Sequence, residues 1–207
     1  MIVINKIEGI DELTRKLKSL PKVVAKATVS GLNKIGSQGT TQAKRKITSW
    51  YNIKQKDLKG HVMLIRARSA SKTRAERHFA IVRGTGKPIP LMKFAARPTE
   101  PPVQKGIPVG KRKPVTVKVL KNQPRKIVRH AFVAQLRTTA APNMFMRKGK
   151  ARHPVRTLYS LGIQKMFEKE GIPAIEEIAR TKGRRILEHE LDFYLKKESG
   201  LLPAKGK

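Results

Sequence analysis

The chain has 207 residues, enough for one domain with a buried core, although its apolar share of 39% lies below the roughly 45–50% that globular domains usually have. Forty-seven Lys and Arg residues face fourteen Asp and Glu residues, and the resulting formal charge of +33 favours an anionic partner. The absence of cysteine excludes disulfides and thiolate sites, and without a signal peptide or membrane-spanning run we expect a protein that is made in a cytoplasm and stays soluble or joins a particle.

The first sixty residues predict helices after a short arm. Residues 1–20 read as an N-terminal arm followed by a short helix, and residues 21–60 as a long-helix region that ends in a short helix capped by Gly60. Pro21 suits the first turn of the long helix because one N–H there has no partner in any case. The apolar side chains expected to form its buried stripe are Val24, Ala27, Leu32, Ile35, Ala43 and Ile47.

Residues 61–161 change to the period of β-strands. Segments 61–68 and 77–84 predict a hairpin, and the two prolines of 87–94 allow only an edge strand or an extended segment. Residues 95–114, with five prolines and two glycines, predict a long basic loop. Further strands or extended stretches are expected at 115–122, 130–136, 143–149 and 155–161.

The C-terminal part predicts one more helix, over 173–197, followed by a flexible tail at 198–207. We therefore predict a single α+β domain over 1–207. Its long N-terminal helix and its C-terminal helix pack on an antiparallel sheet of about five or six strands, with extended loops or arms.

No constellation of residues predicts catalysis, a metal site or a cofactor site. The five histidines are scattered, and Asp57, Glu76 and Glu100 are the only acids between residues 13 and 167. The acidic cluster at 188–192 is expected on an exposed helix face. Segment 83–87 (RGTGK) lacks the full phosphate-loop pattern, so it predicts a hairpin exit. We therefore expect a protein that is not an enzyme and that has no cofactor.

The basic residues form a block without acids. Residues 101–167 contain sixteen Lys and Arg and no Asp or Glu, whereas residues 168–207 contain nine basic and eight acidic residues. For any single basic run a solvated loop is an equal alternative, but together the runs favour contact with phosphates or with an acidic protein. The aromatic residues Phe132, Phe145 and Tyr159 are expected in the core. The predicted contact residues are Lys111, Arg112, Lys113, Arg147, Lys148, Lys150 and Arg152.

Three glycines interrupt the long helix. Gly31, Gly36 and Gly39 each cost a helix about 1 kcal/mol relative to alanine, so tertiary packing must compensate. Small side chains let another backbone approach closely, and we expect these glycines to meet either a neighbouring subunit or the C-terminal helix.

Specific motifs resemble the minor tail protein Z family of tailed bacteriophages. In residues 131–163, the strand AFVAQL is followed after a variable turn by MFMRKGKARHPVRTLYSLGI, which matches the family's two strands, basic turn and entry into the last helix. The N-terminal half agrees through ATVSGLNKIG (27–36), IKQKDLK (53–59) and PIPLMKFAAR (88–97). The resemblance covers residues 20–195, and the main departure is the proline-rich insert at 98–114.

This resemblance implies a structural virion protein of the phage tail. It implies a protein that completes the head-proximal end of the tail and forms part of the neck, or head-tail junction. It also implies a homo-oligomer, a hexameric ring around the DNA channel, whose partners are the tail tube or tail terminator and head-tail connector proteins, with non-specific contact with phage DNA and no membrane. The alternative left open by composition is a free basic nucleic-acid-binding protein of ribosomal or nucleoid type, and a nuclease ranks third because carboxylates are missing.

Overall fold

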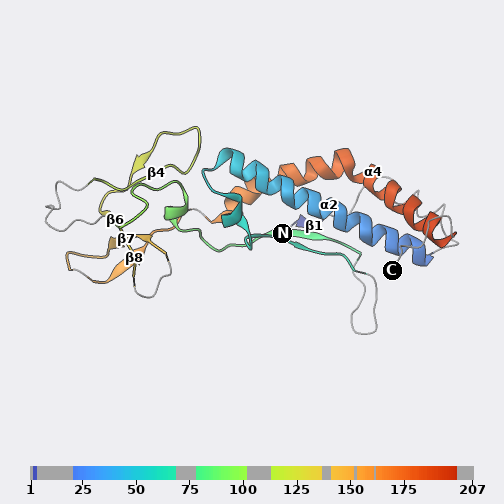
Figure 1. The fold of residues 1–207 in the computed structure, drawn as a ribbon, viewed down its shortest axis with the longest axis horizontal. Helices are drawn as coiled ribbons and strands as arrows, with labels where there is room; N and C mark the ends of the chain where they lie inside the picture. The colour runs from blue at the N-terminus through green and yellow to red at the C-terminus, as the bar shows by residue number, and fades with distance from the viewer. Residues whose placement is uncertain are drawn as a thin grey trace. The chain divides into compact units, whose positions relative to one another are not determined.

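The computed structural model describes residues 2–3, 21–68, 78–101, 113–136, 141–151, 153–160 and 162–199. These residues divide between two compact units, which we describe separately (Figure 1). Unit 1 comprises Met1–Lys44, Val62–Gly84 and Phe167–Lys207, and unit 2 comprises Arg45–His61 and Thr85–Met166. The predicted short helix of the N-terminal arm and most of the predicted C-terminal tail lie outside the described residues.

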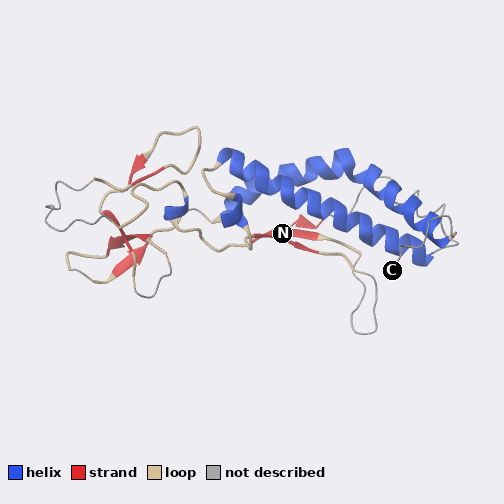
Figure 2. Ribbon diagram, viewed as in Figure 1, coloured by secondary structure: helices blue, strands red, loops and turns tan. Residues whose placement is uncertain are grey.

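The elements confirm the predicted α+β class (Figure 2). Within the described residues the strands divide among three small antiparallel sheets, ordered β1-β3-β2, β4-β5 and β6-β7-β8, where the sequence predicts one sheet of five or six strands. In chain order the elements are β1 (Ile2–Val3), α2 (Pro21–Trp50), η1 (Gln55–Leu58), β2 (Val62–Ile65), β3 (Ile81–Gly84), η2 (Leu91–Lys93), β4 (Thr116–Val117), β5 (Lys126–Ile127), β6 (Ala131–Ala134), β7 (Asn143–Arg147), β8 (Val155–Thr157), α3 (Ile163–Met166), the π-helical turn η4 (Phe167–Gly171) and α4 (Ile172–Glu198).

Unit 1 is built on helices α2 and α4, which lie side by side in Figure 1. The predicted stripe of α2 is buried, except that it begins at Val23, which is 4% exposed, where the sequence suggested Val24. Leu32 of this stripe packs in one cluster with Ala67 and Ala80, which follow β2 and precede β3. The apolar face of α2 therefore covers the β2–β3 hairpin, as expected for a helix with an apolar stripe.

Asn33 joins α2 to the end of β2. Its side-chain amide donates to the carbonyl of Ala67 at 2.9 Å, and its side-chain oxygen accepts from the N–H of Ala67 at 2.8 Å. Ala67 is only 4% exposed, so both of its backbone groups need a partner within the protein. Asn33 supplies the two bonds that a further strand would otherwise have made.

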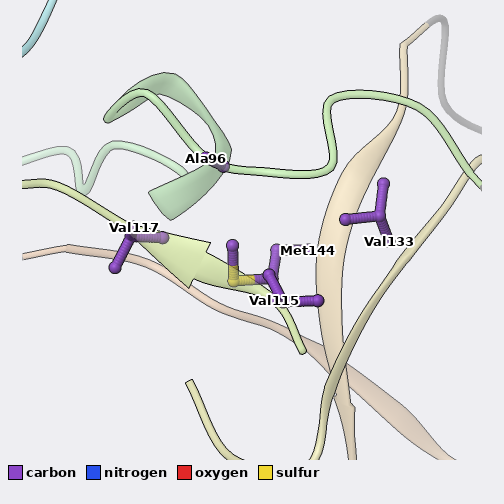
Figure 3. Close-up of a cluster of buried hydrophobic side chains, with 5 residues drawn as sticks. All are labelled: Ala96, Val115, Val117, Val133 and Met144. Atoms are coloured by element: carbon purple, nitrogen blue, oxygen red, sulfur yellow. The ribbon is translucent and has the colours of Figure 1, made fainter. Parts of the chain in front are cut away.

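Unit 2 has its own core, formed by short strands and turns (Figure 3). Val133 and Met144 occupy opposite positions on β6 and β7, so their side chains share one face of that sheet. They pack against Val115 and Val117 of the β4 segment and against Ala96. All five side chains are at most 5% exposed.

The last turn of α2 is attached to the β4–β5 hairpin within unit 2. The carbonyl of Trp50 accepts from the N–H of Lys121 at 2.9 Å, and the N–H of Asn52 donates to the carbonyl of Val119 at 2.8 Å. The chain then forms η1, and Gly60 takes a φ of +84°, which suits glycine as a cap. The short helix predicted before Gly60 is therefore confirmed, and it is a 3₁₀ helix.

Candidate functional site

Positive charge is concentrated in unit 2. This unit contains 24 Lys and Arg residues and two acids, Asp57 and Glu100, for a formal charge of +22. Unit 1 contains 23 basic and 12 acidic residues, for a charge of +11. The Asp57 carboxylate accepts a hydrogen bond from Lys93 Nζ at 2.6 Å, so one of the two acids of unit 2 already has a cationic partner. The basic surface of unit 2 is therefore the candidate functional site.

Three of the predicted contact residues lie together on the β7–β8 hairpin. Arg147 ends β7 opposite Val155 of β8, and the N–H of Lys148 donates to the carbonyl of Pro154 at 3.1 Å. These contacts hold the base of the connecting turn, while the side chains of Arg147, Lys148 and Lys150 are exposed. Arg152 lies outside the described residues.

Arg147 lies over the ring of Phe132, which in turn lies beside the ring of Phe145. Its guanidinium carbon lies 5.8 Å from the centre of the Phe132 ring, and Phe132 lies 6.1 Å from Phe145 across the β6–β7 ladder. A cation above a ring face is attracted by the ring quadrupole, so Phe132 limits the directions that Arg147 takes. Phe145 is buried as predicted, but Tyr159 is 51% exposed, so its predicted place in the core is wrong.

The other predicted contact residues lie near the β4 segment. Lys113 is exposed and stands two residues before Val115, which shares a core cluster with Met144 of β7. Lys111 and Arg112 lie outside the described residues. Among the remaining cations, Arg125 is structural because it donates to the carbonyl of Ala95 at 2.7 Å.

The pKa of His61 is lowered by its surroundings in unit 2. Burial lowers the pKa of His61, and the charges of Lys93 and Lys87 lower it further. Its Nδ1 lies 3.1 Å from the Thr85 hydroxyl oxygen. Neighbouring cations thus keep this imidazole neutral more readily than an isolated histidine. In the described part of the chain no group of histidines and acids is arranged to hold a metal ion.

The glycines of α2 lie against other parts of unit 1. A Cβ atom at Gly31 would lie 2.5 Å from Leu187 Cδ2 of α4, and one at Gly39 would lie 3.2 Å from Ile175 Cγ2 of the same helix. At Gly36 it would lie 2.6 Å from Leu64 Cδ1 of β2. Contact of Gly31 and Gly39 with the C-terminal helix is one of the two alternatives expected from the sequence. Packing of these glycines between subunits stays a prediction.

Glu190 is a carboxylate whose burial the sequence analysis did not predict. It is 3% exposed, although its acidic cluster was expected on an open helix face. Burial alone raises the pKa of Glu190, but hydrogen bonds from Lys34 and Ser30 of α2 outweigh burial and bring the pKa below its ordinary value. Its spacing of three residues from the buried Leu187 is the signal that places it on the packed face of α4.

Comparison with known families decides the class of the protein. The profile of the prophage minor tail protein Z (GPZ) family matches residues 7–198, nearly the whole chain. The chain belongs to this family. It is therefore a minor structural protein of the phage tail and is located in the virion. Searches of curated proteins and of solved structures returned no match to this chain.

None of the described helices has an apolar stretch long enough to cross a lipid bilayer.

Proposed function

We propose that this minor tail protein completes the head-proximal end of the phage tail and forms part of the neck, as a hexameric ring around the DNA channel. The observation that carries the proposal is the charge of +22 on unit 2, with two acids against 24 cations. Such a charge repels itself in an isolated molecule, and duplex DNA neutralises it. DNA that moves through a channel needs contacts to phosphates and no reading of bases.

The β7–β8 hairpin is the part of unit 2 best suited to phosphate contact. Arg147, Lys148 and Lys150 project from a turn whose base is fixed by the Lys148–Pro154 backbone hydrogen bond. Phosphate contacts of this kind release counterions, so they bind strongly at low salt without regard to sequence. We assign the three side chains to the lumen of the ring. The partners on its two faces are the tail tube or tail terminator and the head-tail connector proteins.

Electron microscopy of purified tails tests the location. Tails assembled with a copy that carries an added label are expected to show density for the label at the head-proximal end only. Tails assembled without the protein should fail to join heads. Label at the opposite tip of the tail, or a protein missing from mature tails, would contradict the proposal.

A salt titration tests the assignment to the lumen. Replacing Arg147, Lys148 and Lys150 by glutamine should flatten the salt dependence of duplex binding, with the slope of log K against log salt falling by about 3. The matched control replaces Lys22, Lys26 and Lys182, three exposed cations of unit 1, and should leave the slope nearly unchanged. Tight duplex or RNA binding by an isolated monomer at physiological salt would instead favour the alternative of a free nucleic-acid-binding protein.

A further inference from the structure

The register of the β6-β7-β8 sheet places Arg147 and two aromatic rings on one face. Phe132 of β6 is directly opposite Phe145 of β7, and Val155 of β8 is directly opposite Arg147. Residues two positions apart on a strand share a face, so Arg147 is a diagonal neighbour of Phe132. The strands themselves, and not the turn that follows Arg147, therefore bring its guanidinium carbon to 5.8 Å from the centre of the Phe132 ring.

The two rings on this face suit a cation better than a nucleic-acid base. Phe145 is 2% exposed, and its ring centre lies 6.1 Å from that of Phe132, so Phe145 supports the neighbouring ring within the core. Phe132 is partly buried and carries the Arg147 guanidinium above it. Aromatic side chains that bind single strands need a ring face on which bases stack. Here the guanidinium takes that position.

The Arg147 guanidinium keeps its hydrogen-bond donors for a ligand. A guanidinium stacked on a ring still directs its N–H groups outward in its own plane. None of the ion pairs between described residues involves Arg147, and its side chain is exposed. Arg125 shows the contrast, because its guanidinium donates to the carbonyl of Ala95 at 2.7 Å. The planar fork of Arg147 matches the paired oxygens of a phosphate group.

We propose that Phe132 is a positioning residue, which holds Arg147 so that two of its N–H groups meet both free oxygens of one backbone phosphate of duplex DNA. Lys148 and Lys150 are exposed ammonium groups on flexible stems, so they add charge without a fixed direction. This role rests on the DNA contact of the proposed function. It assigns the directed phosphate contact to Arg147 and its orientation to Phe132.

A double-mutant cycle between Phe132 and Arg147 tests this role. Arg147→Lys keeps the charge and loses the fork, so it should weaken binding to a duplex oligonucleotide about fivefold while the slope of log K against log salt stays unchanged. Phe132→Leu should weaken binding about two- to fivefold in the unaltered chain, and by less than about twofold when it is combined with Arg147→Lys. Phe132→Tyr keeps the ring and should restore the binding.

Two further measurements separate positioning from folding. In NMR spectra of the free protein, the ring current of Phe132 should shift the side-chain protons of Arg147, and Phe132→Leu should abolish that shift. Arg156→Lys is the matched control, because Arg156 is opposite Met146 and so lies on the other face of the same sheet. It should leave duplex binding nearly unchanged. If thermal melting shows that Phe132→Leu does not fold, the comparison of Arg147→Lys with Arg156→Lys still decides, since both side chains are exposed.

The outcomes that contradict the positioning role are distinct from those that contradict the proposed function. An equal loss on Phe132→Leu with arginine or lysine at position 147, or an equal effect of Arg147→Lys and Arg156→Lys, would overturn the positioning role. A loss of more than about tenfold for a single-stranded oligonucleotide, but not for the duplex, would overturn it too and make Phe132 a stacking platform. If the hairpin cations still set the salt slope in any of these cases, the proposed function stands. An unchanged slope after replacement of Arg147, Lys148 and Lys150 by glutamine would reject both.

Discussion

The two units of this tail protein are stabilised in different ways. Unit 1 relies on close helix packing, in which Gly31 and Gly39 of α2 admit side chains of α4 and Gly36 admits Leu64. Unit 2 has short strands, and its turns are joined by single backbone hydrogen bonds, such as Leu91 N–H to the Leu158 carbonyl at 2.9 Å. Unit 1 mixes charges, whereas unit 2 is almost purely basic.

This difference indicates a division of work within one chain. Close packing limits which side chains unit 1 accepts, because an interior near crystal density has no room for an added methyl group. The exposed turns of unit 2 accept such groups, but their cations repel each other and respond to salt. Substitutions should therefore lower stability most in unit 1, and changes of ionic conditions should act most on unit 2.

The largest expected effect is at Gly36. Gly36→Leu should destabilise the protein by about 3 kcal/mol or more, because the added side chain overpacks the contact with Leu64 and Ala80. Chemical denaturation would measure the loss. Gly149 of unit 2 is the matched control, since a Cβ there meets no atom within 4 Å. Gly149→Leu should change stability by less than about 0.5 kcal/mol. Equal losses at the two glycines would remove the contrast between the units.

Asn33 provides a second test of unit 1. Asn33→Ala removes the partners of both backbone groups of Ala67, which is buried, and should cost about 2 kcal/mol. Asn33→Asp keeps the acceptor for the Ala67 N–H and loses the donor to its carbonyl, so its cost should lie between that of alanine and zero. Thermal melting of the unaltered chain and the two variants gives the order of their stabilities. An Asn33→Ala variant that is as stable as the unaltered chain would show that water molecules replace both hydrogen bonds to Ala67.

The sequence predicted unit 1 better than unit 2, for physical reasons. Helices α2 and α4 each repeat apolar residues over many turns. Helix α2 begins at the predicted Pro21, and α4 extends one residue beyond each end of the predicted range 173–197. The sequence did not predict where the helical structure before α4 begins. Pro173 suggested that the chain becomes helical there, but α3 and η4 continue the helical path from Ile163. The ring of Phe167 lies against Gly171 and Gly84, a contact that no local pattern encodes.

Strand β5 of unit 2 is too short for a period-2 pattern, whereas β4, β6, β7 and β8 lie within stretches that the sequence predicted. β5 was not predicted because its two residues, Lys126 and Ile127, are both exposed and show no alternation. Division into three sheets depends on turns and bridges such as Arg97 to Thr116, which join residues nineteen positions apart. For the candidate site, the count of acids and cations located the basic block, but the position of Arg147 over Phe132 required the β6–β7 register.

A smaller effect is expected at the Lys34–Glu190 ion pair of unit 1. Lys34→Met should cost about 1–2 kcal/mol at neutral pH, because Glu190 is buried while Lys34 is half exposed and partly screened. In the unaltered chain the lowered pKa of Glu190 means that its contribution is present above the unfolded-state pKa and is lost as the pH falls through the folded-state pKa. Without Lys34, burial raises the pKa, so protonation should stabilise the variant.

Melting temperatures of the two proteins test this reversal. The deficit of Lys34→Met should shrink as the pH falls from 7 towards the ordinary glutamate pKa of about 4.3. Lys26→Met, at another exposed lysine of α2, is the matched control and should show no such trend. A deficit that stays constant with pH would mean that Lys34 acts through packing of its alkyl chain alone.

The smallest expected effect is at His61 and concerns the basic unit 2. Its pKa is lowered first by burial and then by Lys93 and Lys87, so stability should fall as the pH drops below the ordinary histidine value of about 6.5, by less than ~1 kcal/mol. Salt screens the two lysines but does not change burial. The pKa of His61, followed by NMR, should therefore rise part of the way towards its ordinary value in high salt, and Lys87→Gln should reproduce part of that rise.

Glu190 is the internal comparison for this titration. Its pKa depends on direct hydrogen bonds from Lys34 and Ser30 in a buried site, which salt screens weakly. Salt should therefore move the pKa of His61 more than that of Glu190. An equal response of both groups would show that the field of unit 2 is no stronger than that of unit 1, in spite of a formal charge twice as large. A larger response of His61 would show that the screened charges of Lys93 and Lys87 contribute to its lowered pKa.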